Sequence, residues 1–283
     1  MTRTTDISPL SVLLSRVDAV TDGAPPPLTV PTGFASIDKM LGGGLRRGDL
    51  VVIGGDTASG KSALALAFAI RMALAQARML FLTAEMSPER VLERVIAIEA
   101  RTKIDDLRQG TLDDMARANA GAVALKLREN LPVVDRLPTG GASAIAHMLD
   151  GLPLTEVVFV DALAATIPGN EVVDEELARA VRDLKALAVD RQVVVVTTAT
   201  VRDLGTRSDR RPLLDDFGGR GAIKEHADVV MALFREHMYQ PARDIEGATE
   251  LLIRKNRNGP TGYVDLYFYA QWVRFEDMLD PER

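Results

Sequence analysis

A nine-residue glycine-rich segment constrains the fold of this chain more than any other feature. Residues 54–62 read Gly-Gly-Asp-Thr-Ala-Ser-Gly-Lys-Ser and contain the spacing Gly-x4-Gly-Lys-Ser. The apolar run 50–53 precedes the segment, and an alanine- and leucine-rich stretch, 63–77, follows it. A strand, a glycine-rich loop and a helix in this order are the context in which such a loop binds phosphate. The segment therefore predicts a phosphate loop in an α/β domain, because a glycine turn with a chance lysine leaves both flanks unexplained.

Each fixed position of this loop has a chemical role. Glycines let the backbone curl until successive N–H groups point at the phosphates, and the helix N-terminus adds partial positive charge. Lys61 is expected to reach the β- and γ-phosphates, and the Ser62 hydroxyl to ligate Mg²⁺. We therefore expect a nucleoside triphosphate and Mg²⁺ as cofactors, with the nucleotide, which the family resemblance described below implies to be ATP, held by Gly55, Asp56, Thr57, Ala58, Ser59, Gly60, Lys61 and Ser62.

The composition sets outer limits on the class of protein. A chain of 283 residues suits one large α/β domain with an appended arm. The absence of cysteine excludes disulfides, thiolate zinc sites and cysteine nucleophiles. There is no apolar run long enough to cross a bilayer and no export signal, so we expect a cytoplasmic protein without a membrane partner. A net charge of −6 argues against coating nucleic acid through overall charge, although a local basic loop can still bind it.

Apolar strands alternate with helical segments over most of the chain. The strand candidates are 50–53, 79–83, 157–160, 193–198, 228–233 and 249–254, followed by a hairpin-like pair at 263–269 and 272–275. The helical candidates are 62–77, 88–101, 112–130 and 174–190. This pattern predicts an α/β fold with a mostly parallel sheet flanked by helices on both sides.

The N-terminal segment has a different character. Apolar residues three or four apart over 7–20 predict an amphipathic helix, and the proline-rich stretch 21–27 predicts an extended linker. We therefore divide the chain into an N-terminal helix and linker, 1–31, and an ATPase domain, 32–283. Because so short a helix cannot bury its apolar face on itself, it needs either its own domain or a neighbouring subunit.

Two carboxylates follow predicted strands. Asp161 comes directly after the apolar run 157–160, and ligands bind at the carboxyl ends of parallel strands, so Asp161 is expected to hold Mg²⁺ together with Ser62. Glu85 follows the strand 79–83. It either orients the water that attacks the γ-phosphate or stands near the positive end of the next helix, and spacing alone does not decide.

A basic turn lies near the C-terminus. Residues 254–262 read Arg-Lys-Asn-Arg-Asn-Gly-Pro-Thr-Gly, with three cations in the first four positions. An arginine on a rigid turn can stabilise charge on a transferring phosphoryl group, often from another subunit. A solvated hairpin tip is the alternative.

Together these stretches resemble the RecA-like motor domain of bacterial replicative DNA helicases of the DnaB type, from about residue 32 to 277. Other members of the RecA superfamily share the phosphate loop but seldom the tail at 255–262. The remaining matches are 32–38, 48–50, Ala-Glu-Met-Ser at 84–87, Leu-Lys-Ala-Leu-Ala at 184–188, Arg-Pro at 211–212, Gly-Ala-Ile at 221–223 and Ala-Asp-Val at 227–229.

The resemblance implies roles for several residues. Glu85 matches the family's catalytic glutamate, and Lys255 and Arg257 match the pair that reaches across an interface to the neighbour's γ-phosphate. Such an arrangement implies a homo-oligomeric ring, usually a hexamer, because head-to-tail contacts must close. The helix at 7–20 matches the linker helix that packs on the adjacent subunit. The family's N-terminal collar domain has no counterpart in the resemblance, so a separate collar protein or helicase is an expected partner.

The chain departs from the family at three places. Ala-Leu-Ala follows Asp161 in place of Tyr-Leu-Gln, and 217–220 read Phe-Gly-Gly-Arg in place of Leu-Arg-Glu-Ser. The glutamine with which the family senses the γ-phosphate is replaced by Ala199. These changes bear on the coupling of hydrolysis to strand movement and leave ATP binding intact.

The segment 202–224 is the candidate for contact with single-stranded DNA. It carries six cations against four aspartates, and in a ring six such segments would line the pore and follow the phosphate backbone. A flexible solvated loop is the alternative. The residues expected to bind DNA are Arg202, Arg207, Arg210 and Arg211.

The leading hypothesis is a ring-forming ATPase that acts as a DnaB-like DNA helicase or single-stranded DNA translocase. The first alternative is a regulatory or recombination ATPase of the KaiC or RadA kind, with turnover independent of DNA. The second is a nucleotide-binding scaffold that joins a full-length helicase ring through residues 7–20.

Overall fold

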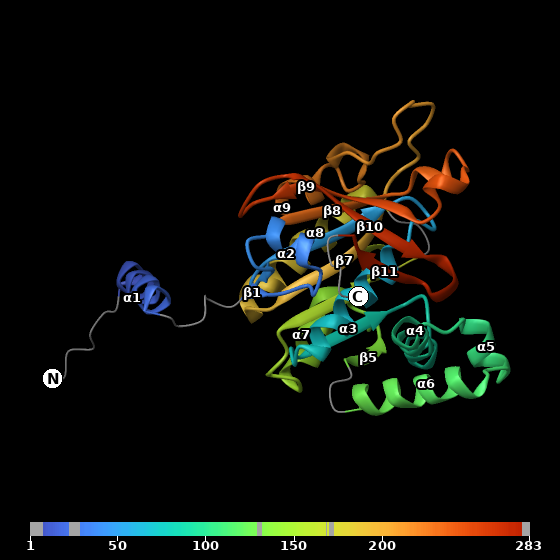
Figure 1. Cartoon of the computed structure of the whole chain (residues 1–283). Helices are drawn as coiled ribbons and strands as arrows, with labels where there is room; N and C mark the ends of the chain where they lie inside the picture. The colour runs from blue at the N-terminus through green and yellow to red at the C-terminus, as the bar shows by residue number, and fades with distance from the viewer. Residues whose placement is uncertain (1–7, 23–28, 129–131, 168, 170–172, 279–283) are drawn as a thin grey trace.

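A nine-stranded sheet forms the centre of the protein (Figure 1). The computed structural model describes residues 8–22, 29–128, 132–167, 169 and 173–278. Six neighbouring strands are parallel, in the order β8-β3-β7-β6-β4-β5, and an antiparallel edge, β11-β10-β9, continues from β8. The predicted α/β fold with a mostly parallel sheet is confirmed.

The predicted strands are all present, with small shifts at their ends. The parallel strands are β3 (Leu50–Gly55), β4 (Met79–Thr83), β5 (Val133–Arg136), β6 (Val157–Asp161), β7 (Val194–Thr200) and β8 (Val229–Phe234). The antiparallel strands are β9 (Ala248–Asn256), β10 (Gly262–Tyr269) and β11 (Arg274–Asp277), and β10–β11 is the predicted hairpin. A separate small sheet joins β1 (Thr29–Val30) to β2 (Leu45–Arg46). Strand β5 was not predicted, because four residues that include two charges carry no strand signal of their own.

The long predicted helices are confirmed, whereas the short ones escaped prediction. The predicted helices correspond to α1 (Pro9–Thr21), α3 (Lys61–Leu74), α4 (Pro88–Ala100), α6 (Asp114–Leu127) and α8 (Asp174–Arg191). The unpredicted helices are α2 (Ala35–Met40), α5 (Ile104–Gln109), α7 (Gly141–Asp150) and α9 (Ala222–His226). Helix α6 starts later than the predicted residue 112 because the Asp113 side chain accepts from the Ala116 N–H and caps it. Residues 129 and 130 of that prediction, and residue 7 of the first helix, lie outside the described residues.

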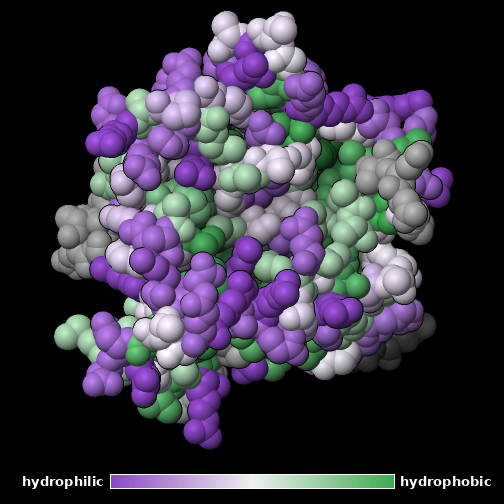
Figure 2. Space-filling model, turned by 90° about the vertical axis from the view of Figure 1, so that its right-hand side faces the viewer, coloured by the Kyte–Doolittle hydropathy of each residue, from purple (hydrophilic) through white to green (hydrophobic). Residues whose placement is uncertain are grey.

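Among the described residues there are five 3₁₀ turns, most of them at strand ends. They are η1 (Leu163–Thr166), η2 (Leu214–Asp216), η3 (Glu236–Met238), η4 (Arg243–Ile245) and η5 (Ala270–Trp272). Among the described residues, no helix is both long and apolar enough to cross a membrane. On the face shown in Figure 2, polar and charged residues predominate, and apolar residues are exposed between them.

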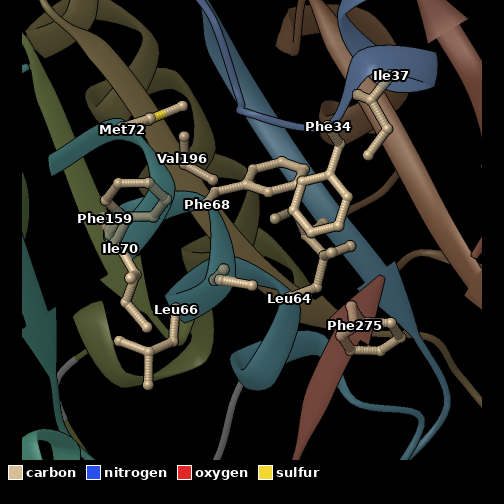
Figure 3. Close-up of a cluster of buried hydrophobic side chains, with 14 of the residues drawn as sticks. Phe34, Ile37, Leu64, Leu66, Phe68, Ile70, Met72, Phe159, Val196 and Phe275 are labelled. Atoms are coloured by element: carbon tan, nitrogen blue, oxygen red, sulfur yellow. The ribbon is translucent and has the colours of Figure 1, made fainter. Parts of the chain in front are cut away.

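The two faces of the sheet carry separate hydrophobic cores. Alternate residues of β3 point to opposite sides: Val51 and Ile53 join the core formed by α2, α3 and α4, while Leu50 and Val52 join the core formed by α7, α8 and α9. Helix α3 is buried over most of its length. In Figure 3, Phe68 of α3 lies beside Phe34, and the two ring centroids are 5.5 Å apart. This packing fixes the helix whose N-terminus carries the phosphate loop.

Helix α1 is the exception to this packing. Four of its apolar side chains are 51–61% exposed, namely Leu10, Leu13, Leu14 and Val17. In Figure 1 the helix lies apart from the sheet and the helices around it. Of the two partners that the sequence left open for this apolar face, the described residues of the same chain do not cover it.

Candidate active site

The phosphate loop joins β3 to α3, and its backbone needs glycine at two positions. Gly55 has φ +152° and Gly60 has φ +103°. A Cβ atom on Gly55 would lie 2.5 Å from the Ser59 hydroxyl oxygen, and one on Gly60 would lie 2.8 Å from the Phe275 ring. The loop is therefore folded tightly on itself and against β11, so any side chain at these glycines would open it.

Lys61 closes the loop from within. Its Nζ donates a hydrogen bond of 2.8 Å to the carbonyl oxygen of Asp56. Burial lowers the pKa of Lys61, while Asp56, Glu85 and Asp161 act in the opposite direction through their charges. The ammonium group thus stands among three carboxylates, at the place where a phosphate would add further negative charge.

Asp161 lies at the end of β6, next to the start of α3, and is fully buried. Its Oδ1 accepts hydrogen bonds from the Ser62 hydroxyl at 2.9 Å and from the Thr198 hydroxyl at 2.6 Å. Its Oδ2 has no hydrogen-bond partner among the described residues. A buried carboxylate oxygen without a partner is costly, so this atom calls for a cation or water.

These contacts fit a magnesium ion bound through few protein ligands. Mg²⁺ usually keeps several waters and takes one or two protein ligands beside substrate phosphates. The described residues contain no cluster of three or more histidine, cysteine, aspartate or glutamate side chains, so they offer no cage made of protein alone. Ser62 and Asp161, held 2.9 Å apart, match the sparser arrangement.

Glu85 stands at the same edge of the sheet, just beyond β4. The neighbouring Ala84 N–H donates to the Asp161 carbonyl at 3.0 Å, so the two strand ends are tied together. Helix α4 begins at Pro88 and is capped by Ser87, whose hydroxyl accepts from the Arg90 N–H. Glu85 is therefore outside the cap of α4 and is exposed at the phosphate edge, where a carboxylate can reach an attacking water.

Tyr239 belongs to this site although the sequence did not indicate it. Its hydroxyl donates a hydrogen bond of 2.9 Å to Oδ2 of Asp56, which is 183 residues away in the chain. Burial and this hydrogen bond raise the pKa of Tyr239 to about 12. Oδ1 of Asp56 accepts from the Thr57 N–H at 2.7 Å. Tyr239 thus holds the acidic side chain of the phosphate loop, and no local motif around residue 239 signals such a contact.

Lys255 and Arg257 lie at the amino ends of the parallel strands, whereas the phosphate loop lies at their carboxyl ends. Lys255 pairs with Val230 near the start of β8. Strand β8 runs parallel to β3, with its first residue beside Val51 and its fifth beside Gly55. A six-residue strand spans about 16 Å between its first and last residues. The structure therefore does not bring these two cations to the phosphate loop of their own chain.

Both cations are nevertheless fixed in position. Lys255 Nζ donates to the carbonyls of Lys224 and Glu225 at 2.7 and 3.1 Å, and burial followed by the charge of Arg257 lowers the pKa of Lys255. Arg257 Nε lies 3.0 Å from Oδ1 of Asp228, and its Nη2 donates to the Glu225 carbonyl at 3.2 Å. The turn is thus tied to α9 and to the start of β8, although Arg257 itself is 53% exposed.

Most cations of the segment 202–224 are paired with carboxylates. Arg202 pairs with Asp174, Arg207 contacts both oxygens of Asp216 at 2.8 and 3.0 Å, and Arg211 contacts both oxygens of Glu250 at 2.7 and 2.5 Å. Arg220 pairs with Glu175, and Lys224 with Asp215. The remaining cation, Arg210, makes no hydrogen bond or ion pair with any described residue, and its guanidinium carbon lies 5.9 Å from the Tyr239 ring centroid. The segment is thus folded onto the domain and presents one uncommitted arginine.

Two of the departures from the helicase pattern fall in packed positions. Ala199 is buried in β7 beside Gly54 of β3, with no polar group on its side chain. Phe217 is also buried, and its ring lies against Gly54 so closely that a Cβ atom there would come within 2.1 Å. Here the phosphate loop and the segment 202–224 meet through apolar contacts rather than through a glutamine.

Comparison with known proteins identifies the family of the chain. The family model for the DnaB-like helicase C-terminal domain matches residues 29–277. The chain is 31% identical to the replicative DNA helicase DnaB of Leifsonia xyli subsp. xyli over 256 residues, which cover 88% of this chain and 56% of that protein. It is 31% identical to DnaB of Haemophilus influenzae over 263 residues, covering 89% of this chain and 56% of that protein. The chain thus spans about half the length of the curated relatives it matches.

Two solved structures share the fold. An ATPase domain solved on its own superposes with a TM-score of 0.87 at 22% identity, covering 96% of this chain and 99% of that one. A DnaB-like replicative helicase, solved in a study of its interactions with primase, superposes with a TM-score of 0.85 at 21% identity, covering 96% of this chain and 67% of that one. At these identities the similarity establishes the fold alone.

Proposed function

The chain belongs to the family of DnaB-like helicase C-terminal domains, and we propose that it is the Mg²⁺-dependent ATPase motor of a ring-forming helicase or translocase on single-stranded DNA. The observation that carries this proposal is the separation of the site into two halves. Lys61, Ser62 and Asp161 lie at the carboxyl ends of the parallel strands, whereas Arg257, paired with Asp228, lies at their amino ends. Neither half completes a phosphoryl-transfer site without a second copy of the chain.

In the first half-site, the loop N–H groups and Lys61 bind the phosphates of ATP. Ser62 and Asp161 would hold Mg²⁺, which neutralises charge on the β- and γ-phosphates when bound. Thr198 fixes the Asp161 carboxylate from the far side by its hydrogen bond of 2.6 Å. Glu85 orients the attacking water and accepts its proton. Each of these groups comes from the carboxyl end of a parallel strand or from the helix that follows one.

In the second half-site, Lys255 and Arg257 act on the ATP of the adjacent subunit. A guanidinium group delivered in trans stabilises charge that develops on the transferred phosphoryl group. Head-to-tail contacts of this kind close into a ring, and six subunits is the number that the family leads us to expect. The exposed apolar face of α1 packs on a neighbouring subunit in the same ring, and residues 1–31 serve as the helix and linker that reach it.

Single-stranded DNA is the proposed substrate of the ring. Arg210 makes no hydrogen bond or ion pair with a described residue, and Arg202, Arg207 and Arg211 of the same segment are exposed or half-buried but paired with carboxylates. Six copies of this segment around a pore would bind the phosphate backbone without reading its sequence. A further protein, either a collar protein or a complete helicase, remains an expected partner, and the cytoplasm is the proposed location.

The test is steady-state ATP hydrolysis with and without single-stranded DNA at low salt, where phosphate contacts are least screened. We expect several-fold stimulation by DNA and loss of that stimulation as salt rises. Turnover that ignores DNA would contradict a helicase and favour a regulatory ATPase. Very slow turnover together with co-assembly into another helicase ring would favour the scaffold.

A further inference from the structure

Tyr239 lies between the phosphate loop and the basic segment. On one side its hydroxyl donates to Oδ2 of Asp56 at 2.9 Å. Its ring stacks on Phe234 at the end of β8, with the centroids 5.8 Å apart and the planes 13° from parallel. The ring is therefore oriented by one contact, and the hydroxyl is committed to another.

The basic segment rests on the same two aromatic rings. The guanidinium carbon of Arg211 lies 4.6 Å from the Phe234 ring centroid, and that of Arg210 lies 5.9 Å from the Tyr239 ring centroid. Arg207 Nη2 donates a hydrogen bond of 2.8 Å to the Arg211 carbonyl and so fixes the backbone between residues 207 and 211. An open cavity of about 390 Å³ adjoins this place, lined in part by Arg210, Arg211, Phe234 and Tyr239.

Arg210 and Arg211 differ in their freedom to leave these rings. Arg211 is held by two hydrogen bonds to Glu250 of β9, so it is part of the fold. Among the described residues, Arg210 has only the weak attraction of the Tyr239 ring, which is worth about 0.5–1 kcal/mol at an exposed site. A DNA phosphate offers Arg210 a charge-assisted hydrogen bond, which is stronger.

The loss of the family's glutamine makes this path significant. Ala199 carries no polar group, and the bond from the Val201 N–H to the Gly55 carbonyl at 3.1 Å only continues the strand pairing of β7 with β3. The hydrogen bond of Tyr239 is instead a side-chain contact made to the phosphate loop itself. A movement of Arg210 can therefore be transmitted to Asp56 through the ring and the hydroxyl of Tyr239.

We propose that Tyr239 is a positioning residue that couples the DNA-binding segment to the phosphate loop. When Arg210 turns to a DNA phosphate, the ring of Tyr239 shifts against Phe234, and its hydroxyl moves Asp56 and the loop with it. By linkage, nucleotide at the loop changes the affinity for DNA by the same factor as DNA changes the affinity for nucleotide. This inference rests on the proposed function, because it requires that the segment bind single-stranded DNA.

The test measures that factor in Tyr239→Phe, which keeps the ring and removes only the hydroxyl. Anisotropy of a fluorescein-labelled oligo-dT gives the DNA Kd with and without AMP-PNP, and the ratio of the two values is the coupling factor. We expect about fivefold or more in the wild type. In Tyr239→Phe we expect a factor below about twofold, while the DNA Kd without nucleotide stays near the wild-type value because Arg210 is retained. The control is Tyr263→Phe, since Tyr263 is exposed and its hydroxyl makes no hydrogen bond with a described residue.

Arg210→Gln and the double variant complete the cycle. Arg210→Gln is expected to weaken DNA binding and to remove the coupling, and Tyr239→Phe is expected to lower the coupling no further in that background. A Tyr239→Phe coupling factor equal to that of the wild type would overturn the inference and leave the motor proposal standing. A wild type that binds DNA without coupling would also overturn it. A wild type that does not bind DNA would instead refute the proposed function itself.

Discussion

The two ends of the parallel strands differ in how fully their buried aspartates are hydrogen-bonded. At the carboxyl end, Asp161 is buried with one oxygen that no described residue satisfies. At the amino end, Asp228 is also buried, but it accepts from the Leu50 N–H at 2.8 Å and from Lys185 at 2.6 Å, and Arg257 lies at 3.0 Å. The unsatisfied oxygen of Asp161 marks a place for a ligand. The hydrogen-bonded carboxylate of Asp228 instead holds the Arg257 guanidinium in place.

The largest expected effect tests whether the phosphate loop of one subunit contacts Arg257 of the next. Lys61→Ala and Arg257→Ala should each lower ATP turnover by at least about 100-fold, because each removes one half of the phosphoryl-transfer site. Mixing the two inactive proteins should restore activity, since a ring of both contains interfaces where an intact loop meets an intact arginine. Random assembly of equal amounts would make about one interface in four complete.

The control for this experiment is Arg243→Ala, which removes an exposed cation from η4 and should not change turnover. The measurement is steady-state hydrolysis of the single variants, of their mixture after subunit exchange, and of wild type mixed with each. A mixture as inactive as its components would contradict a site shared between subunits.

The next prediction distinguishes an aspartate that binds a ligand from an aspartate that stabilises the fold. Asp228→Asn should lower the free energy of unfolding by about 2–3 kcal/mol, because it removes the charge of a buried carboxylate that pairs with the partly exposed Lys185 and Arg257. Asp161→Asn in metal-free buffer should leave the free energy of unfolding unchanged or slightly raised, because it removes a charge that is only partly satisfied. Asp161→Asn should instead lose Mg²⁺-dependent ATP binding. Denaturant unfolding of both variants checks the comparison, and equal losses of stability would contradict it.

Asp49 provides a smaller effect at the amino end. Burial and the charge of Asp228 raise the pKa of Asp49 to about 6. The native state therefore binds this proton more tightly than the unfolded state, so the wild type loses stability as pH rises from about 4 to about 6. Asp49→Asn has no such loss. The difference in free energy of unfolding between Asp49→Asn and the wild type should grow over that interval to about 1–2 kcal/mol, a value that is reduced because Asp49 is partly exposed. Above pH 7 this difference should stay constant.

The measurement is the difference in unfolding free energy between Asp49→Asn and the wild type at several pH values, because the difference cancels the other titrating groups. Asp265→Asn serves as the control, since Asp265 is exposed on β10. A difference that does not change with pH would show that folding does not raise the pKa of Asp49.

The same comparison explains which parts of the site the sequence could predict. The positions of the phosphate loop between β3 and α3 and of Asp161 at the end of β6 follow from local patterns, because a parallel sheet brings the carboxyl ends of its strands together. The contact of Tyr239 with Asp56 joins residues 183 positions apart, so no pattern within either segment contains it. The pairing of Arg211 with Glu250 was hidden for the same reason, and a loop that looked freely basic is in fact mostly neutralised. Helix α7 was missed because its position depends on packing of Ile145 and Leu149 on the sheet.

The smallest expected effect on stability concerns α1, which lies apart from both ends of the parallel strands. Leu13→Asp should change the free energy of unfolding of the monomer by less than about 0.5 kcal/mol, because this side chain is already exposed. If α1 packs on a neighbour, the same substitution should shift the ring toward smaller species, since it places a charge in a buried interface. Sedimentation velocity over a range of concentrations measures the shift, with the exposed Ser15→Asp on the same helix as the matched control. An unchanged ring would mean that the contact between the loop of one subunit and Arg257 of the next holds the assembly together without α1.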